Sequence, residues 1–478
     1  MDKKIYSGRS KIICNRILLA ILFVLTGLSA GNWKPFNLAH KRTIRDLDQA
    51  LTRYYKPDEP GAVVLVYKDN EVLYRQAFGM ADLQLGCRLK PEMSFKIGSM
   101  TKQFTAVAVM MLLEQGKLKL DDSIFDYLDD FPRKEYPVTI EQLLTHTSGI
   151  EDFIDYTNIR NDCDVDCLIE GFKDAPLLSP PGSQFKYSNP GYVLLGKIIE
   201  KVSGSTYQEY MASMIFNPLG MMNTFCGDKS TIINGLVKGY RKDGEVYINA
   251  PYMSMTHPYS AGCLVTNVDD LVIWHKALLE ERLIKKESLR KCFTSYNLYG
   301  GEKAGYGYGW FINQFKGRYN ISHGGGVFGF VCHGMYLPEE NLYVAILSNR
   351  INPAAVPGTQ GIAEMIAAIA IGEPMEIVDK ISAGVAEEQL TAFTGKYYSF
   401  SDGAVNRERY RLIMVEDGKV FLGVNAVKRV EILPASATEF FVQGVPGSIE
   451  FQINATGQVE RFTQKRANGE VRIWVKED

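Results

Sequence analysis

A serine and a lysine three positions apart open a long apolar segment of this sequence. Ser99 and Lys102 form the pattern S-x-x-K at the start of residues 99–114, which are rich in Ala, Val, Met and Leu and stop at Gly116. Residues i and i+3 share one face of a helix, so the lysine amine can reach the serine hydroxyl. The free N–H groups at a helix N-terminus favour negative charge, and a half-buried lysine loses affinity for its proton. The pattern therefore predicts a nucleophilic serine with a lysine as its activating partner.

The same pattern occurs a second time, at Ser183 and Lys186. This copy follows Pro180-Pro181-Gly182 and opens no predicted helix. A lysine there has no helix face to share with the serine, so we assign no chemistry to the second copy.

A tyrosine with an asparagine two residues later is the second element that bears on this chemistry. The candidates are Tyr156 with Asn158, Tyr187 with Asn189, and Tyr247 with Asn249. Only the middle pair directly precedes a helix start, because Asn189-Pro190 predicts an N-cap followed by a proline in the first turn. A nearby ammonium favours the phenolate, so Lys102 would allow Tyr187 to act as a base. We expect Asn189 to cap the helix and to hydrogen-bond a substrate carbonyl.

Three consecutive glycines follow a predicted strand at Ser322-His323-Gly324-Gly325-Gly326. We expect this run to turn tightly after the strand. Glycines allow a backbone to approach a ligand closely and to offer it N–H groups. The run is therefore a candidate substrate-binding edge.

Five segments follow one another in the sequence: residues 95–106 around Ser99, 143–150, 181–196 around Tyr187, 260–262, and 306–310 before the glycine run. Their sequences and their order resemble class C β-lactamases and their penicillin-binding, esterase and peptidase relatives. The matches cover most of residues 60–350, and five ordered matches are far more specific than any one of them.

The resemblance implies roles for individual residues. Ser99 would be the nucleophile, Lys102 its activating partner and Tyr187 the general base for acylation and deacylation. The backbone N–H groups of Ser99 and Gly326 would form the oxyanion hole, and His146 would organise a loop. The residues implied to contact substrate are Asn189, His323, Gly324, Gly325 and Gly326.

One motif departs from the family pattern. Where penicillin-recognising enzymes carry Lys-Thr/Ser-Gly, this chain has His323-Gly324-Gly325. Gly324 has no hydroxyl to hold a substrate carboxylate, and histidine is a weaker cation than lysine at neutral pH. The sequence therefore favours hydrolysis of an ester, an amide or a peptide. The alternatives are a true β-lactamase or D-alanyl-D-alanine carboxypeptidase, and a β-lactam or peptidoglycan sensor that does not turn over.

The elements that position these motifs are a mixture of helices and strands. Residues 62–67 and 72–78 predict a hairpin joined at Asp69-Asn70. Further strands are expected at residues 306–311, 319–322, 327–336 and 342–348, and helices at 41–55, after Thr139, at 189–204, from 268 to about 281, and at 360–371. The expected fold class is α/β (α+β): a β-lactamase/transpeptidase-like antiparallel sheet flanked by helices, with a helical subdomain over about residues 115–255.

A break in pattern at Gly372-Glu373-Pro374 separates two expected domains. The serine hydrolase domain would span residues 41–378. Residues 385–478 show short strands with turns at Asp417-Gly418, Thr456-Gly457 and Asn468-Gly469, which predicts a small all-β, barrel-like domain.

The N-terminus has the pattern of a signal peptide, here residues 1–30. Basic residues precede the apolar run 17–28, and Ser29-Ala30 supplies small residues for cleavage. The run is shorter than the roughly 20 residues that a membrane-spanning helix needs. We expect an exported protein, periplasmic or secreted, with an uncleaved N-terminal anchor as the alternative.

Composition limits the partners. The 478 residues are 46% hydrophobic and carry a net charge of -2, which is typical of a globular protein and unlike a nucleic-acid-binding one. The six histidines lack ligand-like spacing, so no metal is expected, and the chemistry needs no cofactor. Cys163 and Cys167 would form a disulfide or remain free thiols. The expected partner is a small-molecule or peptide substrate, with a cell-wall component as a candidate; the oligomeric state stays open.

Overall fold

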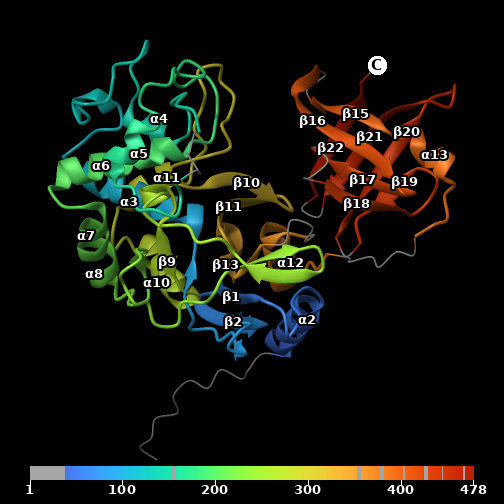
Figure 1. Cartoon of the computed structure of the whole chain (residues 1–478), viewed down its shortest axis with the longest axis horizontal. Coiled ribbons are helices and arrows are strands. Elements are labelled where there is room, and N and C mark those ends of the chain that lie inside the picture. Colours follow the sequence, from blue (N-terminus) through green and yellow to red (C-terminus); the bar gives the residue numbers. More distant parts are fainter. Residues whose placement is uncertain are drawn as a thin grey trace, which may run out of the picture. The chain divides into compact units, whose positions relative to one another are not determined.

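The computed structural model (Figure 1) describes residues 38–152, 158–351, 357–375, 382–401, 404–424, 429–443, 445–466 and 469–477. The expected signal peptide, Tyr156 and Asn468 lie outside these residues. Among the described residues, no helix is both long enough and apolar enough to cross a membrane. The predicted N-terminal helix is confirmed as α2, Leu38–Tyr54.

A six-stranded antiparallel sheet forms the centre of the larger part of the chain, in the order β10-β11-β12-β13-β1-β2. Its strands are β1 (Ala62–Lys68), β2 (Glu71–Phe78), β10 (Phe311–Phe315), β11 (Arg318–Val327), β12 (Phe330–Leu337) and β13 (Leu342–Ser348). The predicted hairpin is confirmed: Asp69 and Asn70 have φ of 52° and 67°, the left-handed backbone of a two-residue hairpin turn.

Helices cover this sheet. Helix α10 (Val268–Leu279) contacts β1 and β13, and α12 (Thr359–Ala370) contacts β12 and β13. Every residue of β13 is buried, so both faces of that strand are covered. The predicted sheet flanked by helices is confirmed.

The expected helical region contains α4 (Ile140–Leu144), α5 (Val165–Glu170), α6 (Asn189–Ser203), α7 (Tyr207–Met211) and α8 (Asn217–Leu219). Thr139 and Gln142 form the predicted capping box of α4. One predicted cap is wrong: Ser188, not Asn189, caps α6, and its hydroxyl accepts a hydrogen bond from the N–H of Gly191. The Asn189 side chain is therefore free for other partners.

Two strand assignments near the glycine run also differ from the prediction. Residues 306–310 form no strand: Tyr306 makes an isolated bridge to Phe311, and the chain bends before β10, with a φ of 89° at Gly309. The glycine run does not turn after the strand. It continues β11, with Gly324 paired to His333 and Gly326 to Val331, and the turn comes later at Gly329.

The C-terminal strands close into a barrel, as the turn spacing predicts. The barrel consists of β15 (Gly395–Ser401), β16 (Ala404–Glu416), β17 (Lys419–Gly423), β18 (Arg429–Pro434), β19 (Glu439–Phe441), β20 (Gly447–Ile453), β21 (Val459–Arg466) and β22 (Val471–Lys476). Tyr397, Phe440, Phe462 and Trp474 are fully buried inside it. The barrel therefore has a hydrophobic core of its own.

Candidate active site

Ser99 lies in a turn of 3-10 helix, Gly98–Met100, that leads directly into α3 (Thr101–Glu114). Gly98 has a φ of 50°, and a Cβ there would lie 2.8 Å from the backbone N and O of Gly326. The serine turn is thus pressed against the glycine edge of β11. This contact brings together the first and third sequence motifs, as the resemblance implied.

Lys102 lies one turn further along and is fully buried. Its Nζ lies 3.2 Å from Ser99 Oγ, 2.7 Å from Asn189 Oδ1 and 2.8 Å from the carbonyl oxygen of Ala261. Burial lowers the pKa of Lys102 to about 7, and the negative charge of Asp152 opposes that shift.

The partners of this amine determine where its lone pair points. A neutral amine has two N–H donors and one lone pair, whereas an ammonium has three donors and no acceptor. The carbonyl oxygens of Asn189 and Ala261 can only accept, so they take two N–H bonds. The remaining direction leads to Ser99, so the neutral form of Lys102 aims its lone pair at the serine hydroxyl.

Tyr187 lies beneath the lysine, with its ring centroid 4.9 Å from Nζ. Burial raises the pKa of Tyr187, and the neighbouring Ser99 hydroxyl lowers it by less. The Tyr187 hydroxyl is buried, and in the part of the chain that the structure describes no hydrogen-bond partner of good geometry reaches it. At neutral pH Tyr187 is therefore a phenol, and Lys102 holds the lower pKa of the two candidate bases.

Asp152 is the residue at this site that the sequence interpretation missed. Its Oδ1 accepts hydrogen bonds from the backbone N–H of Asn189 at 2.9 Å and from Asn189 Nδ2 at 3.1 Å. This fixes the amide so that its oxygen faces Lys102. Asp152 is 37 residues from Asn189 in sequence, and its position just after the 143–150 segment is the one signal that pointed to it.

His146 organises the loop in front of α6, as expected. It is buried with a φ of 56°, and its Nδ1 accepts a hydrogen bond from the N–H of Ser188 at 3.1 Å. Its ring lies 4.2 Å from the ring of Tyr187. His146 therefore fixes both the cap of α6 and the position of Tyr187.

His323 offers no cation to a substrate in this arrangement. The ring is 2% exposed, and burial lowers its pKa to about 3. Nδ1 lies 2.5 Å from the carbonyl oxygen of Gly324 and must donate, which leaves Nε2 to accept from Tyr306 Oη at 3.0 Å. The open part of this edge is the backbone of Gly324, Gly325 and Gly326.

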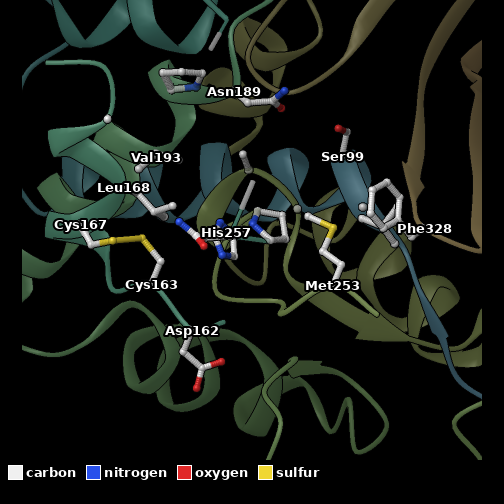
Figure 2. A pocket seen from close by; sticks show the side chains of 18 of the residues that line it. Ser99, Asp162, Cys163, Cys167, Leu168, Asn189, Val193, Met253, His257 and Phe328 are labelled. Carbon is white, nitrogen blue, oxygen red and sulfur yellow. A yellow bond between two sulfur atoms is a disulfide. The ribbon is translucent and has the colours of Figure 1, made fainter. Parts of the chain in front are cut away.

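Two cavities meet at Ser99, and Gly326 lines both. The larger has a volume of about 660 Å³ and includes Asn189 among its walls (Figure 2). The smaller has a volume of about 500 Å³ and is lined by Tyr187 and the glycine edge. The nucleophile therefore has space for one group on each side.

Ser183, Lys186 and Tyr247 lie outside this site, whereas Cys163 and Cys167 lie in the wall of the larger cavity. Ser183 Oγ donates to the carbonyl oxygen of Pro180, and Lys186 is exposed. Tyr247 lies on β8 (Val246–Asn249) beside Arg350. Cys163 and Cys167 form a disulfide. Within the described ranges, no group of three or more His, Cys, Asp or Glu residues is arranged to hold a metal ion.

Comparison with known proteins gives a consistent result. The family model described as Beta-lactamase matches residues 41–367. A penicillin-binding protein of Bacillus subtilis (strain 168) is 28% identical over 413 residues, which cover 82% of this chain and 89% of that protein.

Solved structures share the fold. The octameric penicillin-binding protein homologue from Pyrococcus abyssi has a TM-score of 0.63 at 26% identity, covering 90% of this chain and 98% of that one. The D-amino acid amidase from Ochrobactrum anthropi has a TM-score of 0.60 at 21% identity, covering 70% of this chain and 99% of that one, a likeness of fold alone.

Proposed function

Because the chain belongs to the β-lactamase family of serine hydrolases, we propose that it forms an acyl-enzyme on Ser99 and hydrolyses an ester, an amide or a peptide. The observation that carries this proposal is the buried Lys102 amine, which has a pKa of about 7 and directs its lone pair at Ser99 Oγ. A lysine that is half deprotonated near pH 7 is a competent base there.

In acylation, neutral Lys102 takes the proton of Ser99, and Oγ attacks the carbonyl carbon of the substrate. The backbone N–H groups of Ser99 and Gly326 would hold the resulting oxyanion. Tyr187 then gives its phenolic proton to the leaving group as the carbon–heteroatom bond breaks, and the Lys102 ammonium returns a proton to Tyr187. In deacylation, water attacks the ester carbonyl, its proton passes to the same pair, and Ser99 Oγ regains a proton as it leaves.

The glycine edge supports a substrate without a carboxylate beside the scissile bond. Gly324 brings no hydroxyl, and His323 is buried and neutral. A carboxylate there would lose its hydration without gaining a cation. The D-amino acid amidase from Ochrobactrum anthropi shares the fold, so the fold accommodates amide hydrolysis. A β-lactamase or D-alanyl-D-alanine carboxypeptidase remains the alternative.

We also propose that the protein is exported and meets its substrate, with a cell-wall component as a candidate, outside the cytoplasm. The basic and then apolar N-terminus supports export. The Cys163–Cys167 disulfide supports it independently, because such bonds persist mainly in oxidising compartments.

Turnover and adduct formation test the hydrolase against the sensor. We expect hydrolysis of a short-chain nitrophenyl ester, its loss in Ser99→Ala, and little turnover of a chromogenic cephalosporin. Intact mass measured after exposure to the ester would show no lasting adduct. A persistent adduct without product would instead support the sensor, and efficient cephalosporin turnover without esterase activity would support a β-lactamase.

A further inference from the structure

The lining of the larger cavity extends well beyond Ser99 (Figure 2). Figure 2 shows Ser99 and Phe328 at one end, the Cys163–Cys167 disulfide and Leu168 at the other, and Met253 and His257 between them. A volume of about 660 Å³ falls within the range of pockets that enclose whole small molecules. An acetyl group would leave most of this space unused.

The position of Tyr187 indicates which part of the substrate enters this cavity. The leaving group must lie beside the group that protonates it, and Tyr187 lines the smaller cavity. Asn189, whose amide is held by Asp152, lines the larger cavity, and Tyr187 is absent from the described lining of that cavity. With the leaving group on the Tyr187 side, the acyl group extends into the larger cavity.

The walls of the larger cavity are mainly apolar. Val193 and Met253 are buried side chains in its wall, and Phe328 stands beside Ser99. No lysine or arginine lines the cavity in the described part of the chain. An anionic acyl group would therefore be desolvated there without a counter-ion.

Asp162 and His257, titratable groups in the wall, already contact other parts of the protein. The Asp162 carboxylate lies 2.5 Å from Lys229 Nζ and accepts a hydrogen bond from Ser254 Oγ at 2.7 Å. His257 Nε2 lies 2.8 Å from the carbonyl oxygen of Asn161, to which it can only donate. The Asp162 charge is therefore already paired, and His257 directs Nε2 at the protein backbone.

We propose that this cavity selects an uncharged, largely apolar acyl group of medium length, well beyond acetyl. The inference rests on the proposed acyl-enzyme at Ser99 and adds the class of acyl group to it. The occupant is a straight or aryl-substituted acyl chain joined to an alcohol or amine that bears no carboxylate.

A series of p-nitrophenyl esters with one leaving group tests the proposal, from acetyl to octanoyl, together with the hemisuccinate as a charged acyl group. We expect kcat/KM to rise roughly fourfold with each methylene until the cavity is filled, because the transfer of each methylene from water into the apolar cavity is favourable. The hemisuccinate should react at least tenfold more slowly than the uncharged ester of equal length.

Variants at the far end of the cavity locate the effect. Leu168→Trp should lower the octanoyl-to-acetyl ratio of kcat/KM at least tenfold, and Leu168→Phe, a milder change, should lower it by less. Leu279→Trp is the matched control: it makes the same substitution at an exposed position on α10 and should keep the wild-type ratio. Thermal unfolding of each variant shows that the fold is retained.

Different results would contradict the selection of the acyl group by the cavity and the acyl-enzyme on Ser99. If acetyl and octanoyl esters are both hydrolysed through Ser99 with no preference, or if Leu168→Trp and Leu168→Phe leave the ratio unchanged, the acyl-selection proposal is wrong and the hydrolase stands. If Ser99→Ala retains full hydrolysis of every ester, the acyl-enzyme itself is wrong.

Discussion

At the scale of single residues, the proposed chemistry depends on the lowered pKa of Lys102. The ring centroids of Tyr187 and Tyr192 lie 4.9 and 5.5 Å from its Nζ. Its hydrogen-bond partners among the described residues are the hydroxyl of Ser99 and the carbonyl oxygens of Asn189 and Ala261. His146 and His323, both with lowered pKa values, add no positive charge at neutral pH. Among the described residues, Asp152 is the carboxylate whose charge raises the pKa of Lys102.

The first prediction concerns pH. Because the reactive form of Lys102 is neutral and its pKa is about 7, kcat/KM should rise tenfold per pH unit below pH 7 and level off above it. A pH profile with the acetyl ester measures this. Lys102→Met should lower kcat at least a thousandfold at every pH. An activity that falls as the pH rises through 7 would contradict the role of Lys102 as a base.

The second prediction identifies Asp152 as a positioning residue. Asp152→Asn keeps an oxygen that can accept from Asn189 but removes the charge, so the acid limb of the pH profile should move to lower pH. Asp152→Ala also frees the Asn189 amide and should lower kcat roughly tenfold with a smaller change in KM.

The control for Asp152 is its neighbour. Glu151→Gln removes the same charge from an exposed side chain one residue away and should leave the acid limb in place. If Glu151→Gln moves the limb as far as Asp152→Asn does, the effect is one of general surface charge and the positioning role is lost.

At the scale of elements, the glycine edge of β11 shows what sequence patterns can and cannot predict. The three glycines indicated a close backbone approach, and that approach exists between Gly326 and Gly98. Their conformation was mispredicted as a turn, because only pairing with β12 keeps them extended. Ser188 and Asn189 are equally good helix caps by residue type, and the interaction of Asn189 with Asp152 and Lys102 decides between them.

Contacts of this kind set the limit of prediction from the sequence. Local periodicity located most helices, the first hairpin and the barrel turns, since those depend on neighbouring residues. Asp152 and Tyr306 act through partners 37 and 17 residues away, and no spacing rule connects them. The neutral state of His323 also follows from burial, which residue type alone does not reveal.

The third prediction compares the stability of alanine variants at two neighbouring glycines of β11, Gly324 and Gly325, which have different space around them. A Cβ at Gly325 would lie 1.9 Å from the carbonyl oxygen of Ile97, next to the serine turn. A Cβ at Gly324 would meet its nearest atom at 3.3 Å. Gly325→Ala should therefore destabilise the protein by about 2–4 kcal/mol. Gly324→Ala should cost less than about 1 kcal/mol.

Chemical denaturation of the two variants measures these costs. Equal free energies of unfolding for Gly325→Ala and Gly324→Ala would mean that β11 and the serine turn are not in the close contact described.

At the scale of the whole molecule, export and disulfide formation should occur together, because disulfides persist mainly in oxidising compartments. Both residues of the disulfide lie in a wall of the proposed acyl cavity. The chain has eight cysteines, of which Cys14 lies in the expected signal peptide and two form the disulfide. The free cysteines of the described residues are Cys87, Cys226, Cys263, Cys292 and Cys332.

The last prediction counts these thiols. Protein recovered from the bacterial periplasm, denatured without reductant and treated with iodoacetamide, should gain five carbamidomethyl groups and lack about the first 30 residues by intact mass. The same chain kept in the reducing cytoplasm should retain its N-terminus and gain eight carbamidomethyl groups.

Seven additions on the exported protein would show that Cys163 and Cys167 remain thiols there. Eight additions on a full-length exported protein would favour an uncleaved N-terminal anchor with no disulfide. Five additions would mean that the signal peptide is removed and that the disulfide in the cavity wall is formed in the exported protein.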